Sequence, residues 1–248
     1  MKVEFTVTDD EARRAREFLD TWSMHRFVAA RIRRNVEGLH ARVDEGEFWD
    51  ALVSALLTTQ QRSGPASAVT RLIRTVPLPL RIDACRGQTD AGAFVESVLA
   101  ARGGIRRGPT IGRELKENLA RLEAGEWRTV ISVLDAIDGT PFSERRAARY
   151  LDACLVGVGP KQARNIPQML GLTRFETPVD SRVMKWLNGF GFPLAVSAAA
   201  LADQACYELV SDGFQALCRA ADVFPCVMDA AIFASFDGDD YGEDVMRW

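Results

Sequence analysis

Apolar residues recur at intervals of three and four along most of the chain, the spacing that lines one face of an α-helix. Runs in which apolar and polar residues alternate, as in strands, are scarce beyond the opening VEFTV. Segments rich in glycine, proline and small polar residues separate the helical stretches. The pattern therefore predicts an all-α fold, a compact bundle of helices of about 10 to 15 residues joined by short loops. The expected breaks fall at residues 58–65, 76–80, 102–112, 138–142, 155–160, 174–180 and 189–193.

One predicted helix, at residues 48–58, ends in a polar turn that contains two adjacent glutamines. Its inward apolar stripe comprises Trp49, Leu52, Val53, Leu56 and Leu57. The sequence TTQQRSG follows, and Pro65 is placed to begin the next helix, because proline is favoured in the first helical turn. We therefore expect Gln60 and Gln61 to project from the surface.

A second pair of predicted helices surrounds the short turn LVGVG. The helix SERRAARYLDAC precedes the turn, with Ser143 as its N-cap, and PKQARNIPQML follows it and is closed by Gly171. Gly157 and Gly159 permit backbone geometries that other residues resist, and Pro160 suits the start of a helix. Free N–H groups at such a helix start can bind an oxyanion such as a DNA phosphate. The alternative is a glycine turn that only connects two packed helices.

Two polar residues beside this turn are candidates for chemistry. Lys161 lies in the first turn of the second helix, where the helix dipole and partial desolvation would favour its neutral, nucleophilic form. Asp180 follows Pro178 and is placed to cap the next helix while its carboxylate faces a cleft. Each residue also has a simpler interpretation: a lysine that only contacts phosphate, and an aspartate that only caps a helix.

Composition limits the classes of protein that this chain can belong to. The chain has 248 residues, 47% of them hydrophobic, which is enough for one large domain or two interleaved lobes. It lacks a run of eighteen apolar residues and an apolar segment near the amino terminus, so we expect a cytoplasmic protein with no membrane partner. The five cysteines are scattered and there are two histidines, so we expect reduced thiols and no catalytic zinc.

The formal net charge of −3 argues weakly against a nucleic-acid partner, because affinity for phosphate comes from Lys and Arg. Arginine accounts for most of the basic residues, and some of the arginines form three positive runs. We interpret these runs as solvated helix faces. Their members are Arg31, Arg33 and Arg34, then Arg102, Arg106 and Arg107, and last Arg145, Arg146 and Arg149.

The combination of LVGVGPK with TPVDSRV resembles the catalytic segment of the helix-hairpin-helix DNA glycosylases, in particular the 8-oxoguanine DNA glycosylases and endonuclease III. Asp180 stands 19 positions after Lys161, and this coupled pattern is more specific than either half. The resemblance is clear over residues 143–190. It is fainter over residues 48–75, where ALLTTQQRSGP is similar to a Leu-Leu-x-x-Gln segment of the family.

The resemblance implies two helical lobes with DNA lying in the cleft between them. One lobe would comprise residues 45–170, with the helix-hairpin-helix motif at 143–171, and the other would combine residues 1–44 with 171–248. The family flips the target base out of the duplex before its chemistry. Carried over, Lys161 would attack C1′ and form a Schiff base, and Asp180 would assist departure of the base.

The resemblance also implies DNA contacts. Gly157, Gly159 and Lys161 would offer backbone N–H groups to a phosphate, and carbonyls near Leu155 and Val158 would hold a monovalent cation that bridges to DNA.

Further contacts remain open. Gln60 or Gln61 would fill the gap left by the flipped nucleotide, and the sequence does not choose between them. Arg182 and Lys185 would contact backbone phosphate or only solvate a helix face. Asn165, one turn after Lys161, would face the base pocket, and Trp248 would supply a stacking face or only dock to the core.

The cysteine spacing separates the branches of the family. Cys206, Cys218 and Cys226 have no fourth cysteine nearby, so we expect no iron–sulfur cluster and no dissociable organic cofactor. A lysine at position 161 argues against the monofunctional alkyl-base branch. Together these features point to the 8-oxoguanine branch.

The sequence therefore predicts a bifunctional DNA glycosylase and abasic-site lyase of base excision repair. It would act as a monomer on double-stranded DNA that contains a damaged base, 8-oxoguanine in the first instance, and it would be associated with the nucleoid in a bacterium. Three alternatives remain: a glycosylase of the same fold for another modified base, a helix-hairpin-helix module that binds DNA without chemistry, and a helical protein-interaction domain.

Overall fold

The computed structural model describes residues 3–38, 42–61, 64, 66–194, 196–197 and 199–237. Over these residues it contains helices and loops and no strand, so VEFTV is an extended segment rather than part of a sheet. None of the described helices combines the length and the apolar character needed to cross a bilayer. The α-helices are α1 (Asp9–Trp22), α2 (Arg26–Arg31), α3 (Glu45–Leu57), α4 (Ala68–Ile73), α5 (Ile82–Arg86), α6 (Ala91–Arg102), α7 (Gly108–Arg121), α8 (Trp127–Asp135), α9 (Pro141–Cys154), α10 (Pro160–Met169), α11 (Ser181–Phe190), α12 (Gln204–Ala220) and α13 (Pro225–Asp237). Short π- or 3-10-helical segments lie at Ile32–Glu37, Leu122–Glu126 and Ala200–Ala202.

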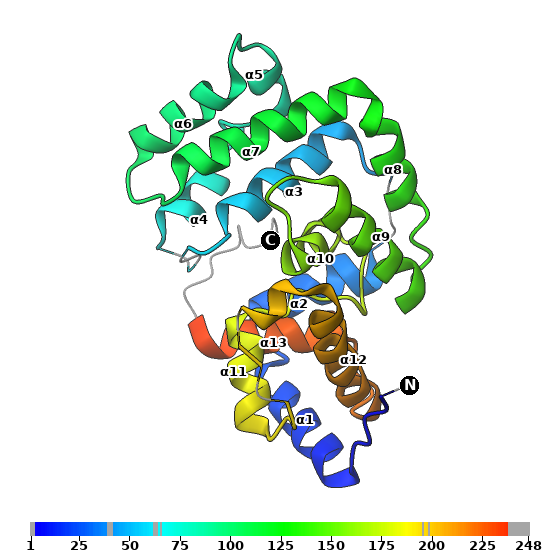
Figure 1. Cartoon of the computed structure of the whole chain (residues 1–248). Helices are drawn as coiled ribbons and strands as arrows, with labels where there is room; N and C mark the ends of the chain where they lie inside the picture. The colour runs from blue at the N-terminus through cyan, green and yellow to red at the C-terminus, as the bar shows by residue number, and fades with distance from the viewer. Residues whose placement is uncertain are drawn as a thin grey trace.

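The helices form two lobes (Figure 1). Each lobe has its own hydrophobic core. The first core extends from Val43 to Leu172 and packs α3 to α10 together. A second core joins α1 to α11, α12 and α13, and a neighbouring cluster packs α2 against α13. The second lobe is therefore built from both ends of the described chain, and the first lobe from its middle.

The central helix of the first lobe, α3, is more deeply buried than its apolar stripe predicts. In addition to the expected residues, Phe48, Ala51, Ser54 and Ala55 are buried, so apolar contacts surround most of the helix. A helix that is apolar on all sides occupies the middle of a bundle rather than its surface. The polar turn that follows α3 is thereby held at a fixed place on the lobe.

Two expected helix starts are wrong. The helix α9 begins at Pro141, and its N-cap is Thr140, whose side chain accepts the N–H of Ser143. Ser143 is therefore a buried residue of the first turn. The helix after the glutamine turn, α4, begins at Ala68 with Ser67 as its cap, and Pro65 lies outside the described residues. In both cases a hydroxyl side chain at another position satisfies the free N–H groups.

The connection from α10 to α11 is extended, and buried side chains hold it in place of regular structure. The Glu144 carboxylate accepts the backbone N–H groups of Arg174, Phe175 and Glu176 at 2.7 to 2.9 Å. Farther along, the Tyr207 hydroxyl accepts the N–H of Val179 at 2.5 Å and donates to the carbonyl of Thr177 at 3.0 Å. Because its polar backbone groups are paired in this way, the connection can cross the protein interior.

The arginine run of α9 was expected to be solvated, but Arg145 and Arg149 form ion pairs between the lobes, next to a buried pair from α10. Arg164 and Glu176 are both fully buried, and their side chains approach to 2.5 Å. Arg145 pairs with Glu176 and Asp212, and Arg149 pairs with Glu208 on α12. Arg145 and Arg149 thus bind carboxylates of the second lobe, and the interpretation as a solvated face is wrong for Arg145.

Replacement of Glu176 by glutamine should lower the free energy of unfolding by about 3–5 kcal/mol, because it removes the close carboxylate partner of the buried Arg164 guanidinium and leaves only Glu208, at 3.7 Å. The matched control is Glu17→Gln, which removes an exposed partner of Arg13 and should cost less than about 1 kcal/mol. Urea denaturation of both variants measures the difference. If both variants lose the same free energy of unfolding, the buried ion pair stabilises the protein no more than the exposed one does.

Candidate active site

A cleft of about 1420 Å³ lies between the two lobes and contains most of the residues singled out from the sequence. Its walls come from the turn after α3, the turn between α9 and α10, and the first turns of α11. The candidate residues that line it are Gln60, Gln61, Gly157, Gly159, Lys161, Asp180, Arg182 and Lys185. Segments that are far apart in the sequence therefore meet at one site.

Lys161 lies in the first turn of α10, directly after Gly159 and Pro160. Gly159 provides no side-chain cap, so the N–H groups at this helix start remain available for an anion. The Lys161 side chain is partly buried, and its Nζ lies 3.4 Å from Oε1 of Gln162. Burial lowers the pKa of the Lys161 ammonium, and Arg182 adds to this, while Asp180 and Asp229 act in the opposite direction.

Asp180 caps α11, as the sequence predicts. Its Oδ1 accepts the backbone N–H groups of Arg182 and Val183 at 2.8 and 3.0 Å. Its Oδ2 lies 3.4 Å from Nη1 of Arg182. Capping fixes the orientation of the carboxylate, and Asp180 lines the cleft together with Lys161.

The turn between α9 and α10 rests on one face of α7. Asn118 clamps Val156 from both sides, accepting its N–H at 2.8 Å and donating to its carbonyl at 2.9 Å. One helical turn earlier, Glu114 lies under Gly157, where a Cβ would come within 2.7 Å of Oε2. Gly157 also has a φ of 77°. Both the space and the backbone conformation therefore require glycine at this position.

Gly159 differs from Gly157, and the expectation of an unusual backbone geometry there is wrong. Its φ is −104°, which any residue can adopt, and a Cβ would meet nothing within 4 Å. Because Gly159 has no side chain, its main chain is open toward the cleft. This accounts for a glycine at the position without any backbone strain.

The structure distinguishes the two glutamines of the turn after α3. The Gln61 amide donates to the carbonyl of Leu57 at 2.9 Å, and its Oε1 accepts the backbone N–H of Arg106 at 2.5 Å. Gln61 therefore fastens its turn to the start of α7. Gln60 is exposed and has a positive φ of 55°, so it projects at the tip of the turn.

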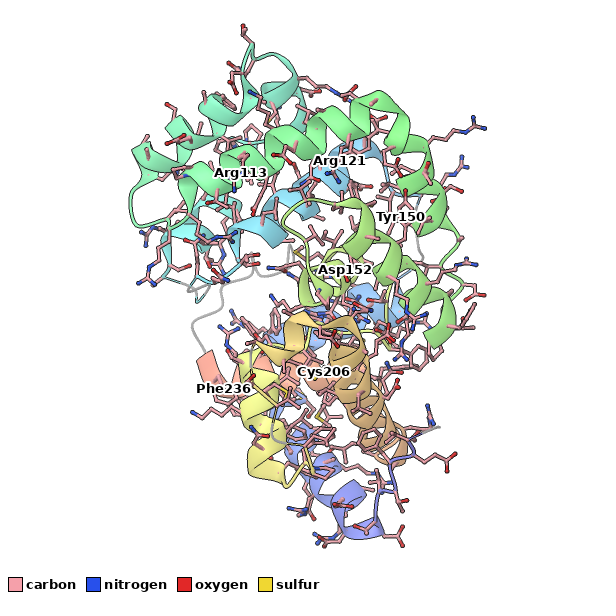
Figure 2. The ribbon with its side chains drawn as sticks, viewed as in Figure 1. Arg113, Arg121, Tyr150, Asp152, Cys206 and Phe236 are labelled. Carbon is pink, nitrogen blue, oxygen red and sulfur yellow. The ribbon has the colours of Figure 1, made fainter. Side chains whose placement is uncertain are left out.

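The two basic residues of α11 lie over aromatic rings of α13. The Arg182 guanidinium is 4.2 Å from the centroid of Phe233, and Nζ of Lys185 is 5.2 Å from that of Phe236. Figure 2 shows Phe236 at the end of α13, on the border of the second lobe. The rings therefore hold the two cationic side chains against α13, and both residues line the cleft.

The remaining expected site residues divide into three cases. Asn165 lines a smaller cavity next to Lys161 and donates to Oε1 of Gln162 at 3.3 Å. The side chains of Leu155 and Val158 are buried in the core of the first lobe, and a monovalent cation at their carbonyls stays a prediction. Trp248 lies outside the described residues.

Sequence reasoning missed a set of buried polar residues around the smaller cavity, which has a volume of about 80 Å³. Arg31, Gln168 and Asp229 line it together with Lys161 and Asp180. Asp229 interrupts the otherwise apolar sequence PCVMDAAIFASF of α13, and this interruption was the available signal. Arg31 had been grouped with a solvated basic run, but it is buried and pairs with Asp229 at 3.3 Å.

Gln162 was also missed, although it joins the two sides of the first lobe beneath the cleft. Its amide donates to the carbonyl of Ala55 and to the hydroxyl of Thr59, each at 2.6 Å. The same side chain accepts from Lys161 and Asn165. Gln162 thus fixes the start of α10 relative to the end of α3.

Gly157→Ala should lower the free energy of unfolding by on the order of 1–3 kcal/mol, because alanine is strained at positive φ and its Cβ would collide with Glu114. Gly159→Ala is the matched control, and we expect it to change the free energy by less than about 1 kcal/mol. Chemical denaturation of the two variants measures both values. A Gly159 variant as unstable as the Gly157 variant would contradict this account of the turn.

The fold of this chain is similar to that of a protein of known structure. No protein-family model and no curated protein sequence matches the chain. Among solved structures, it is similar to the 8-oxoguanine DNA glycosylase of Methanocaldococcus jannaschii, with a TM-score of 0.62 and 14% sequence identity. The alignment covers 91% of this chain and 92% of that one, so the likeness includes both lobes. The predicted fold class is therefore confirmed: the chain has the two-lobed, all-helical fold of the helix-hairpin-helix DNA glycosylases.

Proposed function

We propose that this chain is a DNA glycosylase with abasic-site lyase activity, which binds duplex DNA and excises an oxidised base, with 8-oxoguanine as the leading candidate. The observation that carries the proposal is the convergence of Lys161 and Asp180 on one cleft. Burial lowers the pKa of the amine, and capping orients the carboxylate. The likeness in fold to an 8-oxoguanine DNA glycosylase supports the same conclusion.

In the first chemical step, the neutral amine of Lys161 attacks C1′ of the flipped nucleotide, and the bond from C1′ to the base breaks with its electron pair going to the base. The base leaves after taking up a proton, and the amine loses one. The ionised carboxylate of Asp180 stabilises the positive charge that develops on the sugar and on the attacking nitrogen.

The lyase step follows from the same covalent intermediate. Opening of the sugar ring breaks the bond from C1′ to O4′, O4′ takes up a proton, and the Lys161 nitrogen becomes a protonated Schiff base. The Schiff base acidifies the C2′ proton. Loss of that proton expels the 3′ phosphate and cleaves the strand, and water then releases the lysine.

Binding of the duplex would use the borders of the cleft. The free N–H groups at the start of α10 suit a backbone phosphate, and they need no particular base sequence. Gln60 would enter the gap left by the flipped nucleotide, because it is the exposed glutamine at the tip of the turn, whereas Gln61 is held by Leu57 and Arg106.

Borohydride trapping tests the proposal. We expect the wild type to form a covalent adduct with a duplex that carries one 8-oxoguanine and with an abasic duplex, and we expect Lys161→Gln to form neither. Burial lowers the pKa of Lys161. The pH at which trapping on the abasic duplex reaches half of its maximum should therefore lie below the ordinary lysine pKa of about 10.4.

Each other outcome of the trapping experiment favours a named alternative. Trapping on the abasic duplex alone would retain the lyase and assign another modified base as the substrate, to be found with a panel of lesions. Duplex binding without an adduct on either substrate would favour the non-catalytic helix-hairpin-helix module. A duplex affinity that is absent, or that does not fall as salt rises, would favour a protein-interaction domain.

Replacement of the two glutamines should have different effects on base excision and on stability. Gln60→Ala should reduce base excision by about tenfold or more with little change in stability, because it removes only the side chain that fills the gap. Gln61→Ala should lower the free energy of unfolding by about 1–3 kcal/mol, because it leaves two backbone groups unpaired. Single-turnover excision and urea denaturation of both variants test this. Equal kinetic effects with equal stabilities would contradict the assignment.

A further inference from the structure

The start of α7 is occupied by a residue that local rules disfavour at this position. Arg107 is the N-cap of α7, and its φ of 63° lies in the left-handed region. Helix caps are usually Ser, Thr, Asp, Asn or Gly, and a positive φ favours glycine. The helix dipole also disfavours a cation at a helix start. Although a glycine follows at position 108, the left-handed position is the one that carries the arginine.

The contacts of the Arg107 guanidinium account for this choice, because they join two segments that are distant in the sequence. Nη2 donates to Oε1 of Glu114 at 3.0 Å, and Nη1 lies 3.5 Å from the carbonyl oxygen of Thr59. Thr59 directly precedes Gln60 in the turn after α3. The Arg107 side chain is 23% exposed. Arg107 had been grouped with a solvated basic run, and that interpretation is wrong for it.

Glu114, the partner of Arg107, lies beneath the glycine turn between α9 and α10. Its side chain is 9% exposed. A Cβ at Gly157 would lie 2.7 and 2.8 Å from the two carboxylate oxygens, so the main chain of the turn rests directly on this carboxylate. The ion pair with Arg107 holds the carboxylate in this place.

The ion pair therefore joins two parts of the cleft that would act on DNA in the proposed function. The glycine turn leads to the N–H groups at the start of α10, which would bind a backbone phosphate. The turn after α3 presents Gln60, which would enter the gap left by the flipped nucleotide. A series of direct contacts connects the two turns, and it runs through Gly157, Glu114, Arg107 and Thr59.

A direct contact with DNA is the other use for an arginine near this cleft, and the position of Arg107 argues against it. Arg106 lines the main cleft, whereas Arg107 is absent from its walls. Both terminal nitrogens of Arg107 face protein acceptors. The backbone N–H of Arg106 is bound by Gln61, so two successive residues at the start of α7 contact the turn that carries Gln60. Arg107 is thus placed to position that turn rather than to bind the duplex.

We infer that Arg107 and Glu114 are positioning residues, which fix Gln60 at a set distance from the proposed phosphate site at the start of α10. The inference rests on the proposed function and adds the residues that would determine which nucleotide is displaced. A phosphate held at the start of α10 sets the register of the duplex on the protein. Because the turn after α3 is held relative to that phosphate, Gln60 enters the stack at one base step. Loss of the ion pair would leave duplex binding intact and lower the fraction of complexes with a correctly flipped nucleotide.

The test is a double-mutant cycle between Arg107 and Gln60. It measures single-turnover excision at saturating enzyme, with 8-oxoguanine or the base preferred in the lesion panel. Arg107→Asn removes the guanidinium, and asparagine tolerates a positive φ. We expect this variant to excise at least about tenfold more slowly than the wild type, as Gln60→Ala does. In the Gln60→Ala background the same change should slow excision by less than about threefold, because Arg107 acts through Gln60.

The cycle distinguishes positioning from a general structural role. A loss of structure unrelated to Gln60 would slow excision by the same factor in both backgrounds, and that result would overturn the inference. A wild-type excision rate for Arg107→Asn would overturn it as well.

Duplex affinity separates positioning from phosphate binding. Arg113→Gln is the matched control, because Arg113 is an exposed arginine of the same helix (Figure 2) and its replacement removes the same charge. Both arginine variants should bind an abasic-analogue duplex within about threefold of the wild-type affinity, and the control should keep the wild-type excision rate within about twofold. If Arg107→Asn instead weakens binding by about tenfold or more and excises at the wild-type rate at saturation, Arg107 is a DNA contact and not a positioning residue.

A second variant serves if Arg107→Asn does not fold. Glu114→Gln keeps the shape of the side chain beneath Gly157 and removes the charge that holds Arg107. It should slow excision by about threefold or more in the wild-type background and have less effect in the Gln60→Ala background. Equal effects in the two backgrounds would again count against the inference.

Borohydride trapping by the wild type separates failure of the inference from failure of the proposed function. A wild type that forms the adduct while the cycle shows equal effects in both backgrounds would retain the lyase and refute only the positioning role. Unchanged excision by Gln60→Ala would refute the role of Gln60 and the inference with it, and again leave the lyase in place. A wild type that traps on neither duplex would refute the proposed function itself.

Discussion

The buried ion pair between Arg164 and Glu176 determines where both candidate catalytic residues lie. The Arg164 guanidinium donates to the carbonyl of Pro160 at 2.9 Å, next to Lys161, and its Nε lies 2.5 Å from Glu176, four residues before Asp180. The same guanidinium lies 4.4 Å from the ring centroid of Tyr207, whose hydroxyl accepts the N–H of Val179. The Arg164 guanidinium therefore fixes the position of the start of α10 relative to the segment that leads into α11.

This arrangement explains how a site can be shared between two lobes that have separate cores. Hydrophobic packing positions helices within each lobe, but it has no directional preference that would align one side chain with another across a boundary. Charge-assisted hydrogen bonds have that directionality. The first lobe contributes Lys161 on a helix braced by Gln162, and the second contributes Asp180 on a helix that this carboxylate itself caps.

The sequence predicted those parts of the structure that depend on nearby residues. Helical spacing indicated the all-α fold, and Asp180 was recognised as a cap because its partners follow it by two and three residues. The pairing of Arg149 with Glu208 could not be predicted, since the partners are 59 residues apart. The residues around a paired arginine look the same in the sequence as those around a solvent-exposed one. The interruption of an apolar run marked Asp229 in the sequence, but its partners Arg31 and Gln168 could not be predicted, because only the fold brings α13 beside α2 and α10.

The extended connection between α10 and α11 has a mechanical consequence. Glu144 holds its first part and Tyr207 its last part, and ion pairs from α9 to α12 lie alongside it, so the lobes cannot hinge about it without breaking buried polar contacts. A rigid cleft does not close around a straight duplex. In a protein of the proposed function the DNA must therefore bend, at an elastic cost on the order of 1–6 kcal/mol that is smallest where stacking is already disturbed. Stiffness of the protein would thus contribute to the search for damage, because intact, well-stacked DNA resists the shape that the cleft imposes.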